Sequence, residues 1–189
     1  MIMQEHPVLA GTRRWIDALI IGQQLCPFAA APVQQGGVVF HLSHATQPQQ
    51  LVEDLYLALC HLRDSDPAGV ETSFLVHPGV LQTFEAQQDF MVAVDGLVYE
   101  AGLEGEIQVV AFHPGYLFAG EEPSGASHYT NRSPYPMLHL LREDSVSRAV
   151  AFFAGVEQIP RRNIARLRKM GVPALETLLA TCRSGDVSL

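Results

Sequence analysis

The sequence predicts an α/β fold, with a small parallel or mixed sheet of three or four strands packed by helices and an all-helical C-terminal part. Short apolar runs at 38–42, 72–77 and 107–112 are typical of strands that are buried on both faces. Stretches of helical periodicity separate these runs, as expected for parallel strands joined by crossover helices. After the third run, proline and serine residues mark the starts of several further helices.

The composition indicates one globular domain over residues 1–189, with 48% hydrophobic and 17% charged residues. The net charge of −8 argues against a general affinity for nucleic acid or for an anionic membrane. Neither a signal peptide nor an apolar stretch of roughly 18 residues is visible, so we expect a cytoplasmic protein without a membrane partner. Three scattered cysteines, none in a C-x-x-C pair, argue against a disulfide framework.

In the first half of the chain, a helix is expected over residues 8–24, where apolar residues recur at helical spacing. The strand at 38–42 follows a connector that contains proline and glycine. Thr46, with Gln49 three residues later, is a candidate capping box for the next helix. Turn residues at 64–69 end that helix before the second strand.

The second half begins with a helix over residues 83–101, and Gly102 is its expected left-handed C-terminal residue. After the strand at 107–112, residues 116–120 are a candidate edge strand. Four helices are then expected, which start at or near Pro136, Ser145, Pro160 and Pro173 and end near Arg142, Phe153, Gly171 and Cys182.

Three histidines, His41, His77 and His113, end the three apolar runs at equal intervals of 36 residues. They should therefore lie at the carboxyl ends of parallel strands, the edge where open α/β sheets bind ligands. Adjacent strands lie about 4.8 Å apart, so neighbouring imidazoles in register can meet around one ion. The three histidines are therefore a candidate site for a transition metal such as zinc.

Two other interpretations remain open for these histidines. Each imidazole can hydrogen-bond a loop carbonyl and serve only to fix its turn. Alternatively, the histidines act in acid–base chemistry, for which His77, His113 and His128 are the candidate catalytic residues. A bound metal with an open coordination position would favour an enzyme, whereas imidazoles bonded to the backbone would favour a non-catalytic module.

A polar loop after the third strand concentrates hydrogen-bond donors that suit a carboxylate or a phosphate. Its alternative role is to satisfy its own backbone through side-chain turns. We expect Arg132 to face the same region as His113, and either to pair with Glu121 or Glu122 or to await an anion. The candidate substrate-binding residues are Tyr129, Asn131, Arg132 and Ser133.

Cys26-Pro27-Phe28 resembles the start of the active site in some glutathione transferases and glutaredoxin-like proteins, in which the thiol lies at a helix N-terminus. Here the helical pattern precedes Cys26, and Pro32 limits any helix after it. The negative end of a helix dipole raises the pKa of a thiol. We therefore expect a buried, slowly reacting Cys26, with a reactive thiol as the alternative.

The segments LCPFA (25–29), FHPGYLFAG (112–120), YTNRSPYPMLHLLRE (129–143) and IPRRNIARLRKMG (159–171) resemble a family of short bacterial proteins that is known only as a domain of unknown function. The resemblance covers most of the chain and implies a bacterial, stand-alone domain. It brings no established activity, cofactor or catalytic residue.

These observations favour a small cytoplasmic enzyme that acts on a small anionic molecule at the His-rich carboxyl edge of the sheet, which is also the candidate metal site. The alternative is a non-catalytic module that binds a small molecule or a protein and whose histidines are structural. The usual motifs of nucleotide-cofactor enzymes, serine hydrolases and zinc proteases are absent from the sequence.

Overall fold

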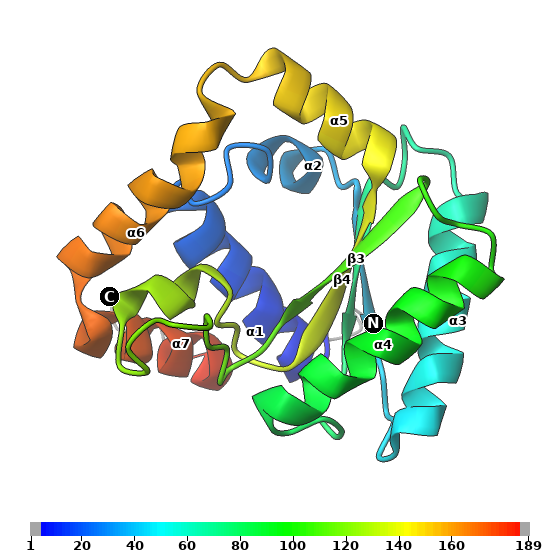
Figure 1. Cartoon of the computed structure of the whole chain (residues 1–189), viewed down its shortest axis with the longest axis horizontal. Helices are drawn as coiled ribbons and strands as arrows, with labels where there is room; N and C mark the ends of the chain where they lie inside the picture. Colours follow the sequence, from blue (N-terminus) through cyan, green and yellow to red (C-terminus); the bar gives the residue numbers. More distant parts are fainter. Residues whose placement is uncertain (1–4, 186–189) are drawn as a thin grey trace.

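The computed structural model describes residues 5–185, and its centre is a four-stranded mixed sheet with the order β1-β2-β4-β3 (Figure 1). β1 pairs in parallel with β2, whereas β4 is antiparallel to both of its neighbours. The predicted strand segments are confirmed, and the sheet is mixed. The strands are β1 (Val38–Leu42), β2 (Thr72–Val76), β3 (Ile107–Phe112) and β4 (Met137–Arg142).

β1, β2 and β3 all run in the same direction, because β2 and β3 are each antiparallel to the intervening β4. Their carboxyl ends therefore share one edge of the sheet, as the spacing of the histidines predicts. The strands are not all neighbours, however. β4 separates β2 from β3, so the histidines that follow these two strands lie on non-adjacent strands.

The helix expected from Pro136 to Arg142 is wrong, because this segment forms β4 in the interior of the sheet. Met137, Leu138 and Leu140 are fully buried, with Leu138 and Leu140 in one core and Met137 in the other. Such burial on both faces of a strand explains why the segment is apolar without helical periodicity. The edge strand expected at residues 116–120 is not formed, because residues 116–118 have no regular structure and residues 119–120 lie in a turn.

α3 (Pro48–Asp64) and α4 (Phe84–Glu100) cover one face of the sheet (Figure 1). Gln47 rather than Thr46 is the N-cap of α3, and it forms the capping box with Gln50. Thr83 caps α4 by accepting a hydrogen bond from the backbone of Ala86. Leucines on α3 and valines on α4 pack against Leu75, Leu138 and Leu140 of the sheet, which makes the first hydrophobic core.

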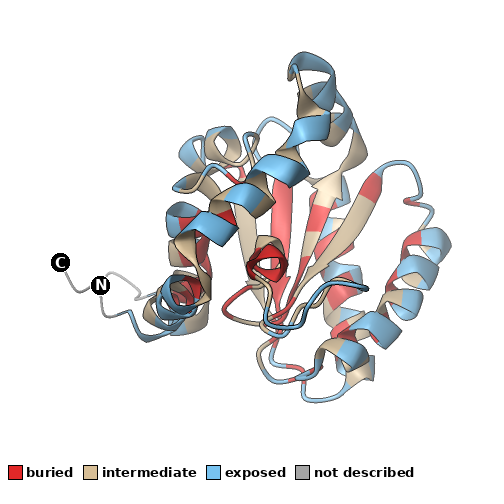
Figure 2. Cartoon of the chain, turned by 60° about the vertical axis from the view of Figure 1, so that its left-hand side comes forward, coloured by how far each residue is buried: buried red, intermediate tan, exposed pale blue. Residues whose placement is uncertain are grey.

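The opposite face carries α1 (Pro7–Trp15), its π-helical continuation η1 (Ile16–Ile21), and the C-terminal helices α6 (Ile159–Met170) and α7 (Val172–Ser184). Together with the short 3-10 helix η2 (Ala126–Thr130), these helices bury a second core. Figure 2 shows the buried residues concentrated on the strands and on the inward sides of the helices.

Two helices complete this second layer. α2 (Ala30–Gln34) contains Pro32, so this proline does not prevent a helix after Cys26. α5 (Glu143–Phe152) follows β4 directly and has no buried residue, and a 3-10 turn, η3 (Val156–Gln158), joins it to α6. The helical C-terminal part is thus confirmed from α5 onward. Among the described residues, no helix has the length and apolar character needed to cross a bilayer.

Candidate functional site

A cavity of about 350 Å³ lies between the sheet and the helices of the second layer. Its sheet wall consists mainly of apolar side chains from all four strands, and Trp15, Ile16 and Ile20 line its helix wall. Val146 and Ala149 of α5 also contact it. The volume falls in the range of small-molecule sites, which are usually apolar with few polar groups. Apart from Arg142 at the end of β4, the residues of the sheet wall are Val38, Thr72, Phe74, Gln108, Val110, Phe112, His139 and Leu141.

The alternation of side chains along the strands explains why these residues share one face. His139 of β4 is paired with Phe74 of β2 on one side and with Val110 of β3 on the other. The buried Leu138 and Leu140 point to the opposite core. The polar His139 between two leucines is therefore the residue that β4 presents to the cavity at the centre of the sheet.

The imidazole of His139 is held in one orientation. It stacks on the Phe74 ring, with 3.9 Å between ring centroids and an interplanar angle of 7°. The Thr72 hydroxyl donates to the carbonyl of Leu140 at 2.6 Å, so its oxygen is left to accept from Nε2–H of His139 at 2.7 Å. This arrangement places the proton on Nε2 and leaves Nδ1 as a hydrogen-bond acceptor. Burial lowers the pKa of His139 to about 3, so the ring is neutral at neutral pH.

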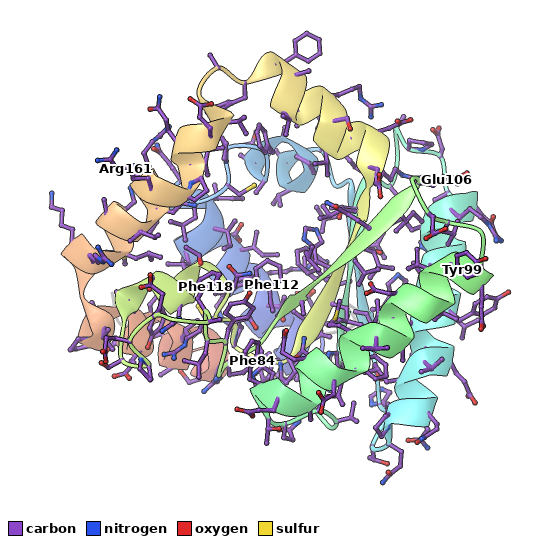
Figure 3. The ribbon with its side chains drawn as sticks, in the orientation of Figure 1. Phe84, Tyr99, Glu106, Phe112, Phe118 and Arg161 are labelled. Atoms are coloured by element: carbon purple, nitrogen blue, oxygen red, sulfur yellow. The ribbon has the colours of Figure 1, made fainter. Side chains whose placement is uncertain are left out.

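Trp15, at the end of α1, forms part of the helix wall and is 1% exposed. Its ring packs edge-on against Phe112, with 5.3 Å between centroids. The indole Nε1–H is buried and has no hydrogen-bond acceptor among the described residues. Figure 3 shows Phe112 on the side of the sheet that faces α1. A buried donor without a partner is costly, and native structures seldom leave one in place without a reason.

Cys26 is half-buried and lines the same cavity, as well as an adjoining pocket that it shares with Asn163. Burial raises the pKa of its thiol, although the backbone N–H groups of Phe28 and Ala29 act in the opposite direction. Asn163 of α6 donates to the carbonyl of Leu25 at 2.7 Å and so holds this segment in place. The raised pKa agrees in direction with the expectation of a slowly reacting thiol.

The histidines at the sheet edge bond to the backbone. Nδ1–H of His77 donates to the carbonyl of Val80 at 3.3 Å, and Nε2–H of His113 donates to Leu81 at 3.2 Å. The backbone N–H of Gly115 donates to Nδ1 of His113 at 2.9 Å. Burial is the main cause that lowers the pKa of both rings, to about 4 for His77. The imidazoles thus fix the turns that follow β2 and β3.

His41 lies apart from this pair, and its ring packs edge-to-face against His61 of α3, with 5.2 Å between ring centroids. β1 is three strand positions from β3, so the backbones of His41 and His113 are about 14 Å apart if strand spacing alone is counted. Among the residues that the structure describes, no group of three or more His, Cys, Asp or Glu side chains could hold a metal ion. The structure therefore gives the predicted zinc site of His41, His77 and His113 no support.

The polar loop returns to the end of β3, where the backbone of His113 bonds to Asn131 and Ser133. The guanidinium of Arg132 donates to the carbonyls of Tyr116 at 3.1 Å and Pro123 at 3.3 Å. Its expected pairing with Glu121 or Glu122 is not found among the ion pairs of residues 5–185. Arg132 instead ties two parts of the loop together.

The other residues of this loop also have internal partners. The His128 ring donates to the carbonyl of Glu122 at 2.7 Å and accepts from the backbone of Phe118 at 3.0 Å. The Ser133 hydroxyl donates to the Tyr135 carbonyl at 2.6 Å. Tyr129 is buried beneath the Arg132 guanidinium, and Asn131 accepts from the Thr130 hydroxyl. The loop thus satisfies its own backbone, which is one of the two roles left open above.

The cavity joins segments that the sequence analysis treated separately. Its wall includes Leu25, Cys26, Phe28 and Ala29 from the first motif, Phe112 from the second, Thr130, His139, Leu141 and Arg142 from the third, and Asn163 from the fourth. Sequence reasoning missed the roles of Trp15, Thr72 and His139. The available signal was His139 itself, a single polar residue inside the otherwise apolar run from Met137 to Leu141.

Comparison with known proteins identifies a family for this chain. No curated protein and no solved structure matches the chain significantly. The family profile described as "Protein of unknown function (DUF1415)" matches residues 7–177, nearly the whole chain and all four motifs quoted above. The chain therefore belongs to the DUF1415 family.

Proposed function

We propose that the protein binds a small, largely apolar molecule in the cavity between the sheet and the second helix layer, and that it acts as a binding protein rather than as a catalyst. The cavity itself carries this proposal, because it has about 350 Å³ of space against an apolar sheet face. Protein interiors are packed as closely as organic crystals, and voids larger than a water molecule are few.

The size of the cavity favours a ligand over a packing defect. The cavity is partly open to solvent, so its mainly apolar wall is exposed to water when the cavity is empty. Covering apolar surface is favourable by about 25 cal/mol per Å². Water is a poor filler, since a buried water needs two to four polar partners and the wall offers few of them. An apolar molecule would regain the missing contacts.

The chemistry of the wall favours binding over catalysis. A general base works best when its pKa lies near the operating pH. The pKa of His139 is lowered to about 3, and the pKa of Cys26 is raised by burial, so neither is an effective base or nucleophile at neutral pH. The alternative, an enzyme for an anionic substrate at the sheet edge, would require His113 and Arg132 to release backbone partners.

Binding can be tested with naphthalene and a reporter that the sequence supplies. Trp15 is the only tryptophan, so the ¹⁵N–¹H correlation spectrum contains a single indole N–H resonance. This resonance reports on the cavity wall, which Trp15 lines. Titration with naphthalene should move this resonance in a saturable manner. Ala149→Phe, which adds a ring to the α5 side of the cavity, should weaken binding by more than about 10-fold through steric filling.

The matched control is Ala151→Phe, two residues further along α5 on an exposed position. It adds the same side chain to the same helix and should bind naphthalene like the wild type. Equal loss of binding in both variants, or an indole resonance that does not respond in the wild type, would contradict the proposed site.

A further inference from the structure

The cavity wall contains a buried hydrogen-bond donor that no group of the described chain satisfies. The Nε1–H of Trp15 is fully buried, and Trp15 is 1% exposed. Indole can only donate, so the group it lacks is an acceptor. A protein loses free energy when such a donor is buried alone, and a ligand acceptor in the cavity would recover it.

The same wall presents an acceptor. Nε2 of His139 is committed to the Thr72 hydroxyl, and that hydroxyl is in turn committed to the Leu140 carbonyl. Nδ1 of His139 therefore carries a lone pair, and it has no hydrogen bond to any residue between 5 and 185 in the structure. The missing partner of this atom is a donor. Trp15 and His139 both line the cavity, and both rings lie against Phe112, at 5.3 and 6.2 Å between ring centroids.

The charges of the wall disfavour an anionic ligand. Of the described residues that line the cavity, Arg142 alone carries a positive charge. Its guanidinium donates to the carbonyls of Leu62, Ser65 and Val70, at the end of α3 and in the turn before β2. Glu71 adds a negative charge to the lining. An anion would therefore be desolvated beside a lone pair and a carboxylate without a free cation.

We propose that the ligand is a neutral, mainly apolar molecule about the size of one or two fused rings, and that it accepts a hydrogen bond from Trp15 Nε1–H and donates one to His139 Nδ1. This inference rests on the proposed function, and it adds the chemical class of the ligand. A hydroxyl group on an aromatic or aliphatic ring has both properties, because its oxygen accepts and its proton is donated.

Four probes with the same fused rings differ in their hydrogen-bonding groups and charge: naphthalene, 2-naphthol, 2-methoxynaphthalene and 2-naphthoate. The binding of each probe is measured at pH 7 by calorimetry and by the shift of the Trp15 indole resonance. We expect 2-naphthol to bind about 10-fold more tightly than naphthalene, since each net hydrogen bond contributes about 0.5–1.5 kcal/mol. 2-Methoxynaphthalene, which accepts but cannot donate, should fall between them, and 2-naphthoate should bind most weakly.

Two variants test the assignment of the partners. His139→Phe retains a ring against Phe74 but removes the acceptor, so it should weaken 2-naphthol by about 3- to 10-fold and leave 2-methoxynaphthalene unchanged. Trp15→Phe removes the donor and should weaken both of these probes relative to naphthalene. A purely structural role of His139 would change the binding of all probes alike and would overturn the assignment.

The outcomes also separate this inference from the proposed function. If naphthalene binds but 2-naphthol binds no better, the ligand class is wrong and the binding site stands. Tightest binding by 2-naphthoate would show an anion site and would overturn the inference as well. If no probe binds, the proposed function and the inference fail together.

Discussion

The fully buried His77 and the partly buried His139 should make the protein less stable as the pH falls from 7 to 5. Burial lowers the pKa of His139 to about 3 and that of His77 to about 4, whereas an unfolded chain has histidines near 6.5. Between these values the unfolded state binds more protons than the folded state, so the free energy of unfolding decreases with decreasing pH. This stability is present above pH 6.5 and is lost as the pH falls toward the folded pKa values.

The size of the effect follows from the separation between pH 5 and the unfolded pKa. At pH 5, 1.5 units below 6.5, each histidine should cost about 2 kcal/mol of stability, or about 4 kcal/mol for the pair. His139→Phe retains a ring against Phe74 but cannot titrate. We therefore expect its loss of stability between pH 7 and pH 5 to be about 2 kcal/mol smaller than that of the wild type.

Urea unfolding at both pH values, followed by circular dichroism and by the fluorescence of Trp15, measures this difference. Leu140→Val is the matched control, because Leu140 is a fully buried neighbour that does not titrate. It should lower stability by the same amount at both pH values. If His139→Phe and the wild type lose equal stability between pH 7 and 5, His139 does not have the lowered pKa that is assigned to it here.

Three further predictions concern other parts of the molecule. Alkylation of Cys26 at pH 7 should be at least about 10-fold slower in the folded protein than in urea, because burial raises the pKa of its thiol, and naphthalene should slow it further. Mass spectrometry of the labelled peptide measures this rate, and rapid labelling of the folded protein would contradict the prediction. Gly79→Ala should destabilise the protein by about 1–3 kcal/mol more than Gly115→Ala, as measured by urea unfolding. The new Cβ at position 79 would lie 2.9 Å from the Ala45 carbonyl oxygen, whereas the Cβ at position 115 would lie 3.4 Å from the His113 side chain. Equal losses of stability in the two variants would refute this prediction. Arg132→Met should cost about 1–2 kcal/mol of stability through its lost backbone bonds, and an unchanged urea midpoint with lost phosphate binding would instead support an anion site.

The strands of the fold could be predicted because their apolar runs are short and end at turn residues. The position of β4 could not be predicted, because Met137–Arg142 is apolar on both faces and follows a proline that also suits a helix start. This one segment decides the sheet order. It places an antiparallel strand between β2 and β3, and so separates the histidines that the equal spacing suggested were neighbours.

The histidine spacing correctly located one edge of the sheet, but it did not locate the cavity. His77 and His113 each follow a strand and precede Pro-Gly, and both bond to backbone carbonyls of the turn after β2, at Val80 and Leu81. The cavity depends on which face each side chain takes. That information requires the register of β4 against β2, which pairs His139 with Phe74 and is not encoded in local periodicity.

The most direct test of the proposed site is a crystal structure of the protein soaked with 6-bromo-2-naphthol, with the bromine located by anomalous scattering. The proposal predicts one bromine peak inside the cavity between the sheet and α5, with the hydroxyl oxygen within hydrogen-bond distance of Trp15 Nε1 and His139 Nδ1. A bromine peak elsewhere on the protein, or a cavity that holds only water bonded to both groups, would contradict it.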